Sequence, residues 1–482
     1  MFGPEGLRPP IAGLTADSNA VEPGFLFAAL PGSRVHGADF AARALERGAR
    51  AILTDAEGFA RIGGETLPAD LTLVLSADPR RHFALAAARF YDLQPGTIVA
   101  VTGTNGKTSV ATFLRQIWAA IGHRAVNFGT TGVEGAVTAG AVHTTPEPVA
   151  LHRLLHDLSE RGVTHAAMEA SSHGLDQRRL DGVRLAAAGF THLSRDHLDY
   201  HGTMEAYAEA KLGLFSRVLP EGAPAVVNLD DPVSTRAGVI AAERGCPVLS
   251  TGRAGAARLR LIETRFTDTG QTIRFAWDGA ERTGELGLVG GFQAENVLMA
   301  AGLAIAAGEA PGRVFEVLPH LTGVRGRMER AAVRANGAAI YVDYSHTPDG
   351  LASALKALRP HVPGRIVVVF GAGGDRDPGK RPMMGEAAAA FADRCIVTDD
   401  NPRSEDPAMI RAAILAACPG ATEIGDRAEA IRAGVDLLGP EDALLIAGKG
   451  HETGQTVGET VLPFDDADEA RKAVAAIDGG EP

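Results

Sequence analysis

The sequence predicts an α/β protein whose mostly parallel sheets are covered by helices and divided among three domains. Short apolar runs alternate with longer helix-like stretches along the whole chain, which is typical of α/β layering. Many of these runs are apolar throughout, as in strands that helices cover on both faces. The length of 482 residues exceeds what one core supports, and about 150 residues per domain gives about three domains.

The first predicted domain covers residues 1–94 and is the smallest. Gly and Pro separate its expected strands, which span residues 25–30, 49–54 and 71–76. A helix is expected over residues 80–93, and the Gln-Pro-Gly sequence at 94–96 would end it, because Pro and Gly break helices. This breaker also marks the expected linker to the second domain.

The second predicted domain, residues 95–330, opens with a strand at 97–102, a Gly-rich turn and a helix over 109–122. Further strands are expected at 164–170, 186–194 and 223–230. Alternating polar and apolar residues at 259–266 and 272–277 then predict antiparallel strands. A helix over 293–307 and an Arg-rich stretch complete this part, so we expect a P-loop-type α/β domain with a parallel sheet.

The third predicted domain, residues 331–482, repeats the α/β rhythm and is expected to be Rossmann-like. Its strands are expected at residues 338–344, 365–370, 394–399 and 442–448. The Gly-rich segment at 371–377 is not a dinucleotide fingerprint, because Arg376 stands where that pattern requires its third glycine. In such sheets the loops at the carboxyl ends of strands form the binding crevice.

Composition excludes several classes of protein. The net charge of −12 argues against a broad nucleic-acid surface, although a few local cations suffice for a phosphorylated small molecule. The three cysteines show no paired spacing, so neither a disulfide framework nor a cysteine zinc site is expected. The start of the chain does not resemble a signal peptide, and no apolar run is long enough to span a membrane. We therefore expect a cytoplasmic monomer that binds small molecules.

The sequence GTNGKTS at residues 103–109 predicts a phosphate-binding loop. It follows a strand and opens a helix, where glycines and free backbone N–H groups can surround phosphate. Lys107 could reach the terminal phosphates, and the hydroxyl of Thr108 or Ser109 could bind Mg²⁺. The loop is shorter between its glycines than the full P-loop pattern. A plain strand-to-helix connection explains the glycines but not the Gly-Lys-Thr-Ser sequence in this position.

Acids and histidines follow two further strands of the second domain. Glu169 ends one expected strand, and DHLDYHG at residues 196–202 follows another. Oxygen ligands beside phosphates suit Mg²⁺, whereas zinc requires three or four close nitrogen or sulfur ligands that no spacing here fixes. Lys211, taken alone, would be an exposed lysine on a helix.

These motifs together resemble the Mur ligases. The resemblance rests on GTNGKTS, EASSHGL, DHLDYHG with the downstream lysine, ENVLMA, GVRGRMER, DYSHTPDGL, GAGGDRDPGKRP and TDDNPRSEDP, which occur in order across all three predicted domains. It implies an enzyme that uses ATP to activate the free carboxylate of UDP-N-acetylmuramoyl-L-alanyl-D-glutamate as an acyl phosphate. The amine of meso-2,6-diaminopimelate would then attack, giving an amide for peptidoglycan synthesis.

The resemblance also implies roles for residues of the second and third domains. ATP would contact Gly103, Thr104, Asn105, Gly106, Lys107, Thr108, Ser109, Asn296, Arg327 and Asp343. Mg²⁺ would be held by Thr108, Glu169, His197 and Lys211. Lys211 matches the lysine that the family carries as a carbamate, in which CO₂ converts the cation into a carboxylate. His346 also matches a family position.

The first domain matches the family's UDP-binding module. The UDP-muramyl dipeptide would contact Ser18, Ser33, Arg34, Val35, Thr144, Thr145, Ser171, Gln177 and Arg179. Asn19 stands where the family often has an arginine, so this edge of the uridine site departs from the family pattern. A pair of threonines is usually only a turn or a cap, and the resemblance alone gives Thr144 and Thr145 a role.

The segment Asp400-Asn401-Pro402-Arg403 discriminates among the amino acids that could be added. Pro402 stiffens the loop, and Arg403 carries a planar fork that suits a carboxylate. Meso-diaminopimelate has a second amino-carboxyl end, whereas lysine ends in an ammonium that Arg403 would repel. The remaining contacts implied by the resemblance are Arg376, Gly448 and Glu452.

Three other functions stay open at this point. A folylpolyglutamate synthase shares the ATP chemistry, but it lacks a separate UDP-type first domain, and residues 1–94 are present here. A Mur ligase that adds lysine or D-Ala-D-Ala is a second alternative, and Arg403 disfavours the lysine form. A nucleotide-dependent switch or transport ATPase is the third, but it would leave the DNPR and GKGHE sequences without a role.

Overall fold

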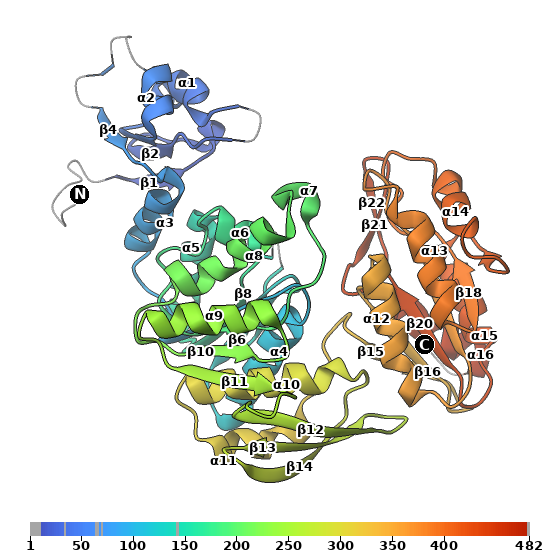
Figure 1. Cartoon of the computed structure of the whole chain (residues 1–482). Helices are drawn as coiled ribbons and strands as arrows, with labels where there is room; N and C mark the ends of the chain where they lie inside the picture. The colour runs from blue at the N-terminus through green and yellow to red at the C-terminus, as the bar shows by residue number, and fades with distance from the viewer. Residues whose placement is uncertain (1–10, 33–34, 63–66, 69–70, 141–143, 480–482) are drawn as a thin grey trace. The chain divides into compact units, whose positions relative to one another are not determined.

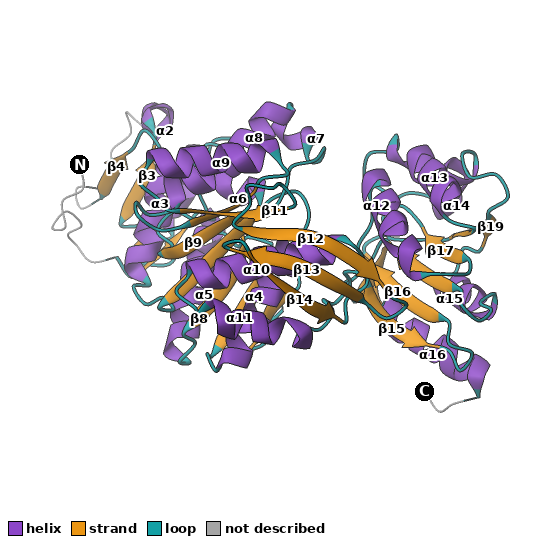
Figure 2. Ribbon diagram, turned by 60° about the horizontal axis from the view of Figure 1, so that its bottom comes forward, coloured by secondary structure: helices purple, strands orange, loops and turns teal. Residues whose placement is uncertain are grey.

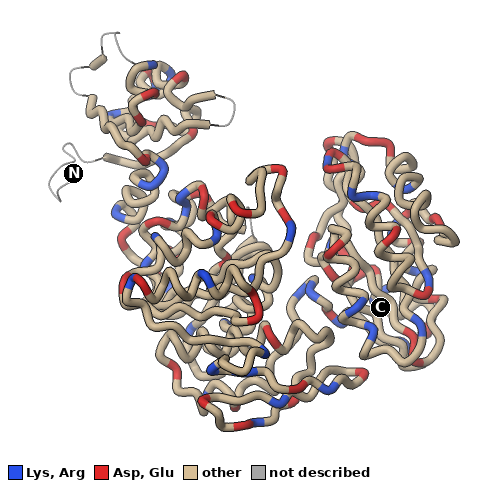
Figure 3. The backbone as a smooth tube through the Cα atoms, in the orientation of Figure 1, with Lys and Arg blue, Asp and Glu red and all other residues tan. Residues whose placement is uncertain are grey.

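The computed structural model describes residues 11–32, 35–62, 67–68, 71–140 and 144–479 (Figure 1). The chain forms two compact units. The first comprises residues 1–250 with 302–309, and the second comprises residues 251–301 with 310–482. Among the described residues, no helix combines the length and apolar character that a membrane crossing needs. Basic and acidic side chains are mixed along the tube rather than segregated by sign (Figure 3).

The first unit begins with a small parallel sheet. Its strands lie in sequence order and are β1 (Gly13–Thr15), β2 (Phe25–Ala28), β3 (Ala51–Thr54) and β4 (Thr72–Leu75). The helices are α1 (Ala41–Glu46), α2 (Ala56–Ile62) and α3 (Pro79–Phe90). Asp78 accepts a hydrogen bond from the N–H of Arg81 and so caps α3. The three expected strands and the expected helix are confirmed, and the short strand β1 is added.

The larger sheet of the first unit has the strand order β11-β10-β9-β5-β8-β6-β7. Its strands are β5 (Thr97–Thr102), β6 (Ala125–Gly129), β7 (Gly132–Gly135), β8 (His165–Glu169), β9 (Leu185–Phe190), β10 (Ala225–Asn228) and β11 (Val248–Gly252). The central strand β5 pairs in parallel with β8 and β9. Its covering helices include α4 (Lys107–Ile121), α5 (Pro148–Glu160) and α9 (Pro232–Glu243) (Figure 2). The carboxyl ends of β5 and β8 therefore meet at one edge of the sheet.

Short helices follow the strands of this sheet. They are α6 (Ser172–Asp176), α7 (Leu198–His201) and α8 (Met204–Gly213), and a π-helical turn at Leu214–Val218 continues α8. Ser171 caps α6 by accepting from the N–H of Gly174, and Thr203 caps α8 by accepting from the N–H of Ala206. The helix α10 (Phe292–Ala306) is apolar along most of its length, so it is buried.

The second unit contains the predicted antiparallel strands and a separate six-stranded sheet. The strands β12 (Leu259–Phe266), β13 (Gln271–Trp277) and β14 (Ala280–Leu286) pair antiparallel. The alternating sequence predicts the first two, and the structure adds β14. The six-stranded order is β15-β16-β20-β17-β18-β19, in which only β15 is antiparallel. These strands are β15 (Glu329–Val333), β16 (Ala339–Asp343), β17 (Ile366–Phe370), β18 (Arg394–Val397), β19 (Thr422–Glu423) and β20 (Ala443–Ala447).

Helices cover the six-stranded sheet and a hairpin follows it. The helices of this unit are α11 (Pro311–Val317), α12 (Pro348–Leu358), α13 (Lys380–Phe391), α14 (Pro407–Leu415), α15 (Arg427–Asp436) and α16 (Asp466–Asp478). The hairpin joins β21 (Gly454–Val457) to β22 (Thr460–Pro463). Strands β17 and β20 are buried at every residue, as their apolar sequences predict.

A buried ion pair attaches the last helix to this sheet. The guanidinium of Arg427 donates two hydrogen bonds of 2.7 Å to the carboxylate of Asp466, and neither side chain is exposed. Arg427 also donates to the carbonyl of Ala447 at the end of β20. A buried charge that loses its partner destabilises a fold. Because Asp466 is the first residue of α16, this helix is an integral part of the second unit.

Candidate active site

The predicted phosphate loop lies between β5 and α4. Gly103 and Gly106 adopt φ angles of 142° and 87°, which glycine reaches without strain. The ammonium of Lys107 folds back over the loop and donates to the carbonyl oxygens of Gly103 and Thr104 at 2.9 and 2.7 Å. The first turn of α4 follows this loop directly, and the N–H groups of a helix's first turn have no acceptor within the helix. This arrangement is suited to binding a phosphate chain.

Glu169 lies directly beside this loop. It is the last residue of β8 and is 2% exposed. Its carboxylate accepts hydrogen bonds from the hydroxyl of Thr108 at 3.0 Å and from the N–H and hydroxyl of Thr130 at 2.8 and 3.1 Å. The structure therefore brings Thr108 and Glu169, two of the residues expected to hold Mg²⁺, into direct contact.

Lys211 is buried and not on an exposed helix face, which corrects the expectation drawn from its sequence alone. It lies in the last turn of α8, is 1% exposed, and donates to the carbonyl of Gly103 at 2.7 Å. Burial, followed by the nearby charge of Lys107, lowers the pKa of Lys211 well below its ordinary value of 10.5. The neutral amine is consequently favoured, and a neutral amine is the form that reacts with CO₂.

His197 lies in a group of aromatic and imidazole rings next to this lysine. It precedes α7 with a positive φ of 52°, and its ring lies 6.0 Å from that of Tyr207 and 5.0 Å from that of His173. The Tyr207 ring also contacts the ammonium of Lys211 at 4.7 Å. Desolvation is the main cause that lowers the pKa of His197. Tyr207 thus brings His197 and Lys211 into one neighbourhood.

Four of the residues predicted to bind the dipeptide form a connected network. The hydroxyl of Thr145 donates to the carbonyl of Glu169 at 3.0 Å and accepts from the N–H of Ser171 at 3.0 Å. Arg179 donates to the carbonyl of Thr145 at 2.8 Å and to the side-chain oxygen of Gln177 at 2.7 Å. This network supports the carboxyl end of β8.

Thr144 joins the same region through its hydroxyl group. Its Oγ1 lies 3.2 Å from Oγ1 of Thr130, which in turn donates to Glu169. The signal for Thr130 was absent from the sequence, because a threonine in a glycine-rich turn has no distinctive spacing. Its contacts with Glu169 make it an additional candidate residue.

The structure describes only part of the predicted uridine site. Ser18 is buried in a short 3₁₀ turn, and Val35 is 55% exposed. Ser33 and Arg34 lie outside the described residues. The side chain of Asn19 accepts a hydrogen bond of 2.9 Å from Arg43, so an arginine from a neighbouring helix approaches the position at which the family often carries one.

The predicted nucleotide contacts of the second unit lie on α10, just before β15 and at the end of β16. Asn296 is largely buried on α10 and donates to the side-chain oxygen of Gln293 at 3.2 Å, and Gln293 donates to the carbonyl of Arg327. The guanidinium of Arg327 stacks on Tyr344 at 4.6 Å. Asp343 accepts from the N–H of Met328 at 2.7 Å, and burial raises its pKa.

His346 follows Asp343 on the same loop. Its Nδ1 lies 2.8 Å from the carbonyl of Tyr344, and its own carbonyl accepts from Lys380 at 3.0 Å. The imidazole ring lies 4.5 Å from the Tyr344 ring. These contacts fix the loop at the carboxyl end of β16.

Arg403 is held in a defined orientation by its surroundings. It adopts a φ of 53°, and its guanidinium donates to the carbonyl of Gly374 at 2.7 Å. Its backbone pairs with the hairpin, through the carbonyl of Thr456 and the N–H of Gly458. Arg376, on the same Gly-rich loop as Gly374, is exposed. The predicted pair of arginines therefore belongs to adjoining loops at the ends of β17 and β18.

Asn401 connects the Asp400–Arg403 loop to the segment that follows β20. Its side chain donates to the carboxylate of Glu452 at 2.9 Å and accepts from Lys449 at 3.1 Å. Lys449 is fully buried and also lies 3.2 Å from Glu452. Sequence reasoning missed Lys449, although it stands in the GKGHE sequence. Its burial between two polar side chains makes it a further candidate residue.

Gly448 and Asp400 approach each other closely. Gly448 has a φ of 121°, and a Cβ atom placed on it would lie 2.5 Å from Oδ2 of Asp400. Pro402 is buried and its carbonyl lies against Gly374. A side chain at position 448 would therefore require the Asp400 carboxylate to move.

Family profiles cover almost the whole length of the chain. The Mur ligase family catalytic domain matches residues 10–91, and the Mur ligase middle domain matches residues 101–304. The Mur ligase glutamate ligase domain matches residues 326–450. A curated protein of Caulobacter vibrioides is 51% identical over 98% of this chain and 98% of its own length.

The chain belongs to the Mur ligase family. The Caulobacter relative is named UDP-N-acetylmuramoyl-L-alanyl-D-glutamate–2,6-diaminopimelate ligase. A relative from Agrobacterium fabrum with the same name is 50% identical over 98% of this chain and 94% of its own length. The resemblance seen in the motifs is therefore confirmed.

Solved Mur ligase structures share the fold. One, also named UDP-N-acetylmuramoyl-L-alanyl-D-glutamate–2,6-diaminopimelate ligase, is 35% identical with a TM-score of 0.71 and covers 97% of this chain and 95% of its own. A MurF ligase from Thermotoga maritima, solved with ADP, is 18% identical with a TM-score of 0.61 and covers 96% of this chain and 97% of its own. These likenesses confirm the predicted α/β fold class.

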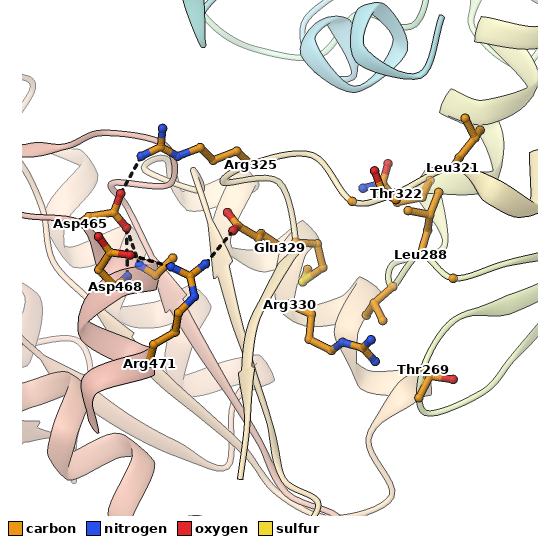
Figure 4. A pocket seen from close by; sticks show the side chains of 16 residues that line it. Thr269, Leu288, Leu321, Thr322, Arg325, Glu329, Arg330, Asp465, Asp468 and Arg471 are labelled. Carbon is orange, nitrogen blue, oxygen red and sulfur yellow. Dashed lines mark hydrogen bonds and ion pairs between the residues drawn. The ribbon is translucent and has the colours of Figure 1, made fainter. Parts of the chain in front are cut away.

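A separate cavity of about 600 Å³ in the second unit is lined partly by the GVRGRMER stretch, but by none of the residues predicted to bind substrates or metal. Figure 4 shows its charged side chains, in which Arg325 pairs with Asp465 at 2.6 Å and Arg471 pairs with Asp468 at 2.6 Å. Arg471 also approaches Glu329 at 3.7 Å. Because Arg325 and Arg471 already pair with acids of the cavity, these contacts give no argument for an ionic ligand.

Proposed function

We propose that this chain is an ATP-dependent amide ligase that joins meso-2,6-diaminopimelate to UDP-N-acetylmuramoyl-L-alanyl-D-glutamate, a step in peptidoglycan precursor synthesis. The convergence of Lys107, Glu169 and Lys211 on one strand-to-helix loop carries the ligase part of this proposal. The choice of substrates is supported by the names of relatives that are about half identical over nearly the full chain.

The reaction divides into two steps. A carboxylate oxygen of the nucleotide-linked peptide attacks the γ-phosphorus of ATP, and ADP leaves. The amine then attacks the carbonyl carbon of the acyl phosphate, and the tetrahedral intermediate expels phosphate while the amine loses a proton. Neither step needs a covalent bond to the protein, so catalysis depends on positioning and on neutralising negative charge.

The phosphate loop would hold the ATP phosphates in the first step. Lys107 would turn from the carbonyl oxygens that it contacts towards the terminal phosphates, and the N–H groups at the start of α4 would bind the others. Asn296, Arg327 and Asp343 would complete the nucleotide site. Thr144, Thr145, Ser171, Gln177 and Arg179 would orient the peptide carboxylate.

The residues at the loop fit Mg²⁺, which neutralises phosphate charge when it is bound. Thr108 and Glu169 offer oxygen atoms beside the loop, and Mg²⁺ prefers such ligands. As a cation Lys211 would oppose a metal, but as a carbamate it would offer two further oxygens. His197, which shares Tyr207 as a neighbour with Lys211, completes the proposed set.

The Asp400–Arg403 loop would select the amino acid. Arg403 and Arg376 offer guanidinium groups for the distal carboxylate of meso-diaminopimelate, and Glu452 offers a carboxylate for its distal ammonium. Asn401 and Lys449 fix Glu452 through hydrogen bonds. The side chain of lysine ends in an ammonium with no carboxylate beside it. Lysine would therefore leave Arg403 and Arg376 without an anion to bind at this end.

The proposal extends to the organisation of the chain. Residues 1–94 would bind the UDP end, residues 95–330 would bind ATP and transfer phosphate, and residues 331–482 would bind the amino acid. The chain would act as a cytoplasmic monomer, because ATP is its energy source and one chain carries residues for both steps.

Phosphate release tests the proposal. The protein is incubated with ATP, Mg²⁺ and UDP-muramyl-L-Ala-D-Glu, with either meso-diaminopimelate or L-lysine. Release that requires both the nucleotide-peptide and meso-diaminopimelate is expected. Release with lysine would retain the ligase and refute the choice of amino acid, and release without the peptide would indicate a switch or transport ATPase. Lys107→Ala is the control for contaminating ATPases.

A further inference from the structure

Three potential metal ligands gather in the first unit, away from the phosphate loop. His123 follows α4, His165 is the first residue of β8, and Glu309 follows α10. Glu169, at the opposite end of β8, belongs to the proposed active site. Four residue steps along a strand separate His165 from Glu169, about 13 Å.

The ligand atoms of this cluster are close to one another. Nε2 of His123 lies 2.7 Å from Oε1 of Glu309, and the rings of His123 and His165 stack with centroids 3.9 Å apart. One nitrogen from each histidine and one oxygen of Glu309 all lie within 4.8 Å of one another. The side chains of His123 and Glu309 are 33% and 13% exposed, so a small ion can reach them from solvent.

Thr164 orients His165 as a neutral ligand. The hydroxyl of Thr164 donates to the carbonyl of Arg124 at 3.4 Å, so its oxygen accepts from Nδ1 of His165, which lies 2.9 Å away. This bond leaves the Nε2 lone pair of His165 available, an arrangement that commonly supports histidine ligands. Desolvation, together with the charge of His123, lowers the pKa of His165 to about 4.

We propose that His123, His165 and Glu309 form a binding site for a zinc-like divalent ion, separate from the proposed active site. Two imidazoles and one carboxylate are a ligand set that Zn²⁺ accepts, with water in the remaining position. Mg²⁺ is disfavoured, because it requires mainly oxygen ligands. The inference does not depend on the proposed ligase function.

Only a small movement would admit the ion. Zinc ligands at their usual bond lengths lie about 3.3 Å apart in a tetrahedron, so His123 and Glu309 would separate by about 0.6 Å. The stacked rings would also splay apart. His123 can make this movement because it lies on a partly exposed loop after the end of α4.

The ion would join three elements of the first unit. It would connect the end of α4, the start of β8 and the segment after α10, and Trp118 packs beside the ring of His165 in the same corner. A ligand that binds the folded but not the unfolded chain raises the unfolding temperature. At a free zinc concentration 100-fold above the dissociation constant, the rise expected for this unit is about 5 °C.

Metal content and thermal unfolding test this site. The full chain is stripped with a chelator and dialysed against low micromolar ZnCl₂, and the bound zinc is counted. His165→Gln and Glu309→Gln, which change different elements, are each expected to bind one zinc ion fewer than the unchanged protein and to lose the thermal shift. His320→Gln, which changes an exposed histidine of the second unit, is the matched control and should retain both.

The comparison between variants separates this site from other zinc-binding groups. His173, His197 and His201 lie near one another, and Cys395 contacts Cys418, so the total zinc content alone is not decisive. Zinc content and thermal shift that are equal in the unchanged protein and both variants would overturn the inference. A thermal shift of the same size with MgCl₂ that both variants lose would also overturn it. Matching circular dichroism spectra without metal establish that the variants are folded.

Discussion

The ammonium nitrogen of Lys211 lies 2.7 Å from the carbonyl oxygen of Gly103, although 108 residues separate them in the chain. This contact places a buried amine against the first residue of the phosphate loop. Lys107 reaches the same carbonyl oxygen at 2.9 Å. Two lysines therefore share one acceptor, and the charge of Lys107 adds to burial in lowering the pKa of Lys211.

Replacing Lys211 with Ala should reduce the rate of ligation by at least about 100-fold, because the proposed carbamate stabilises charge at the phosphate loop. The rate is measured as ADP formation with saturating substrates. Lys356→Ala, on an exposed face of α12, is the matched control and should retain full activity.

A carbon NMR experiment tests the carbamate directly. With ¹³C-labelled bicarbonate, the unchanged protein should give a carbamate signal that Lys211→Ala lacks. An equal signal in both proteins would place the carbamate elsewhere, and a variant with full activity would refute the role of Lys211.

Replacing Lys211 with Met should raise the unfolding temperature while it removes activity. The pKa of Lys211 lies below 10.5 in the folded chain, so between these two values the unfolded chain binds a proton that the folded chain does not. The stability of the unchanged protein therefore falls as the pH falls from 10.5 towards the folded pKa. The Met variant has no ionisable group at this position, so its stability does not fall with pH for this reason.

Calorimetry in CO₂-free buffer at pH 7.5 and 9.5 measures this effect. The advantage of Lys211→Met should be larger at pH 7.5, since that pH is further below the ordinary lysine value. A variant that is less stable than the unchanged protein at both values would show that the hydrogen bond to Gly103 outweighs the desolvation of Lys211.

Replacing Arg403 with Ala should lower kcat/KM for meso-diaminopimelate by about 10- to 100-fold, the loss expected for one hydrogen bond to a charged group. The KM for ATP should change little. Arg432→Ala removes an exposed arginine from α15 and serves as the control. An unchanged preference for meso-diaminopimelate over L-lysine in Arg403→Ala would assign selectivity to other residues.

Replacing Gly448 with Ala should destabilise the chain by about 2–4 kcal/mol, because strain at a positive φ adds to a clash with Asp400. Gly122→Ala is a matched control. Gly122 has a φ of 107°, and a Cβ atom added to it would have no other atom within 4 Å, so only backbone strain of about 1 kcal/mol is expected. Urea unfolding measures the free energy of unfolding of both variants. Equal decreases would show that the Asp400 side chain moves aside without cost.

Apolar runs with clear ends predict the strands well. The strand at 97–102 matches the structure at both ends, because a buried run is bounded there by glycines. The antiparallel strands predicted at 259–266 and 272–277 were recognisable from their alternation. The strands β6 and β21 were not predicted, since Ala125–Gly129 and Gly454–Val457 are short and carry glycine or polar residues.

The surroundings of individual side chains were harder to predict from the sequence than the strands. Nothing around Lys211 in the sequence indicates burial, because its helix has little separation of polar and apolar faces. The burial of Lys449 and the contact of Thr130 with Glu169 depend on residues distant in sequence. The resemblance to the family assigned a role to Lys211 but did not reveal that this side chain is buried. It indicated no role for Lys449 or Thr130.

The pairing of Arg427 with Asp466 has a consequence for shortened forms of the protein. A chain that stops before residue 466 would lack only its last seventeen residues, yet it would leave a guanidinium without a counter-ion inside the domain. Removing one partner of a buried pair costs about 3–5 kcal/mol. Stop codons and frameshifts that remove Asp466 should therefore act as loss-of-function alleles.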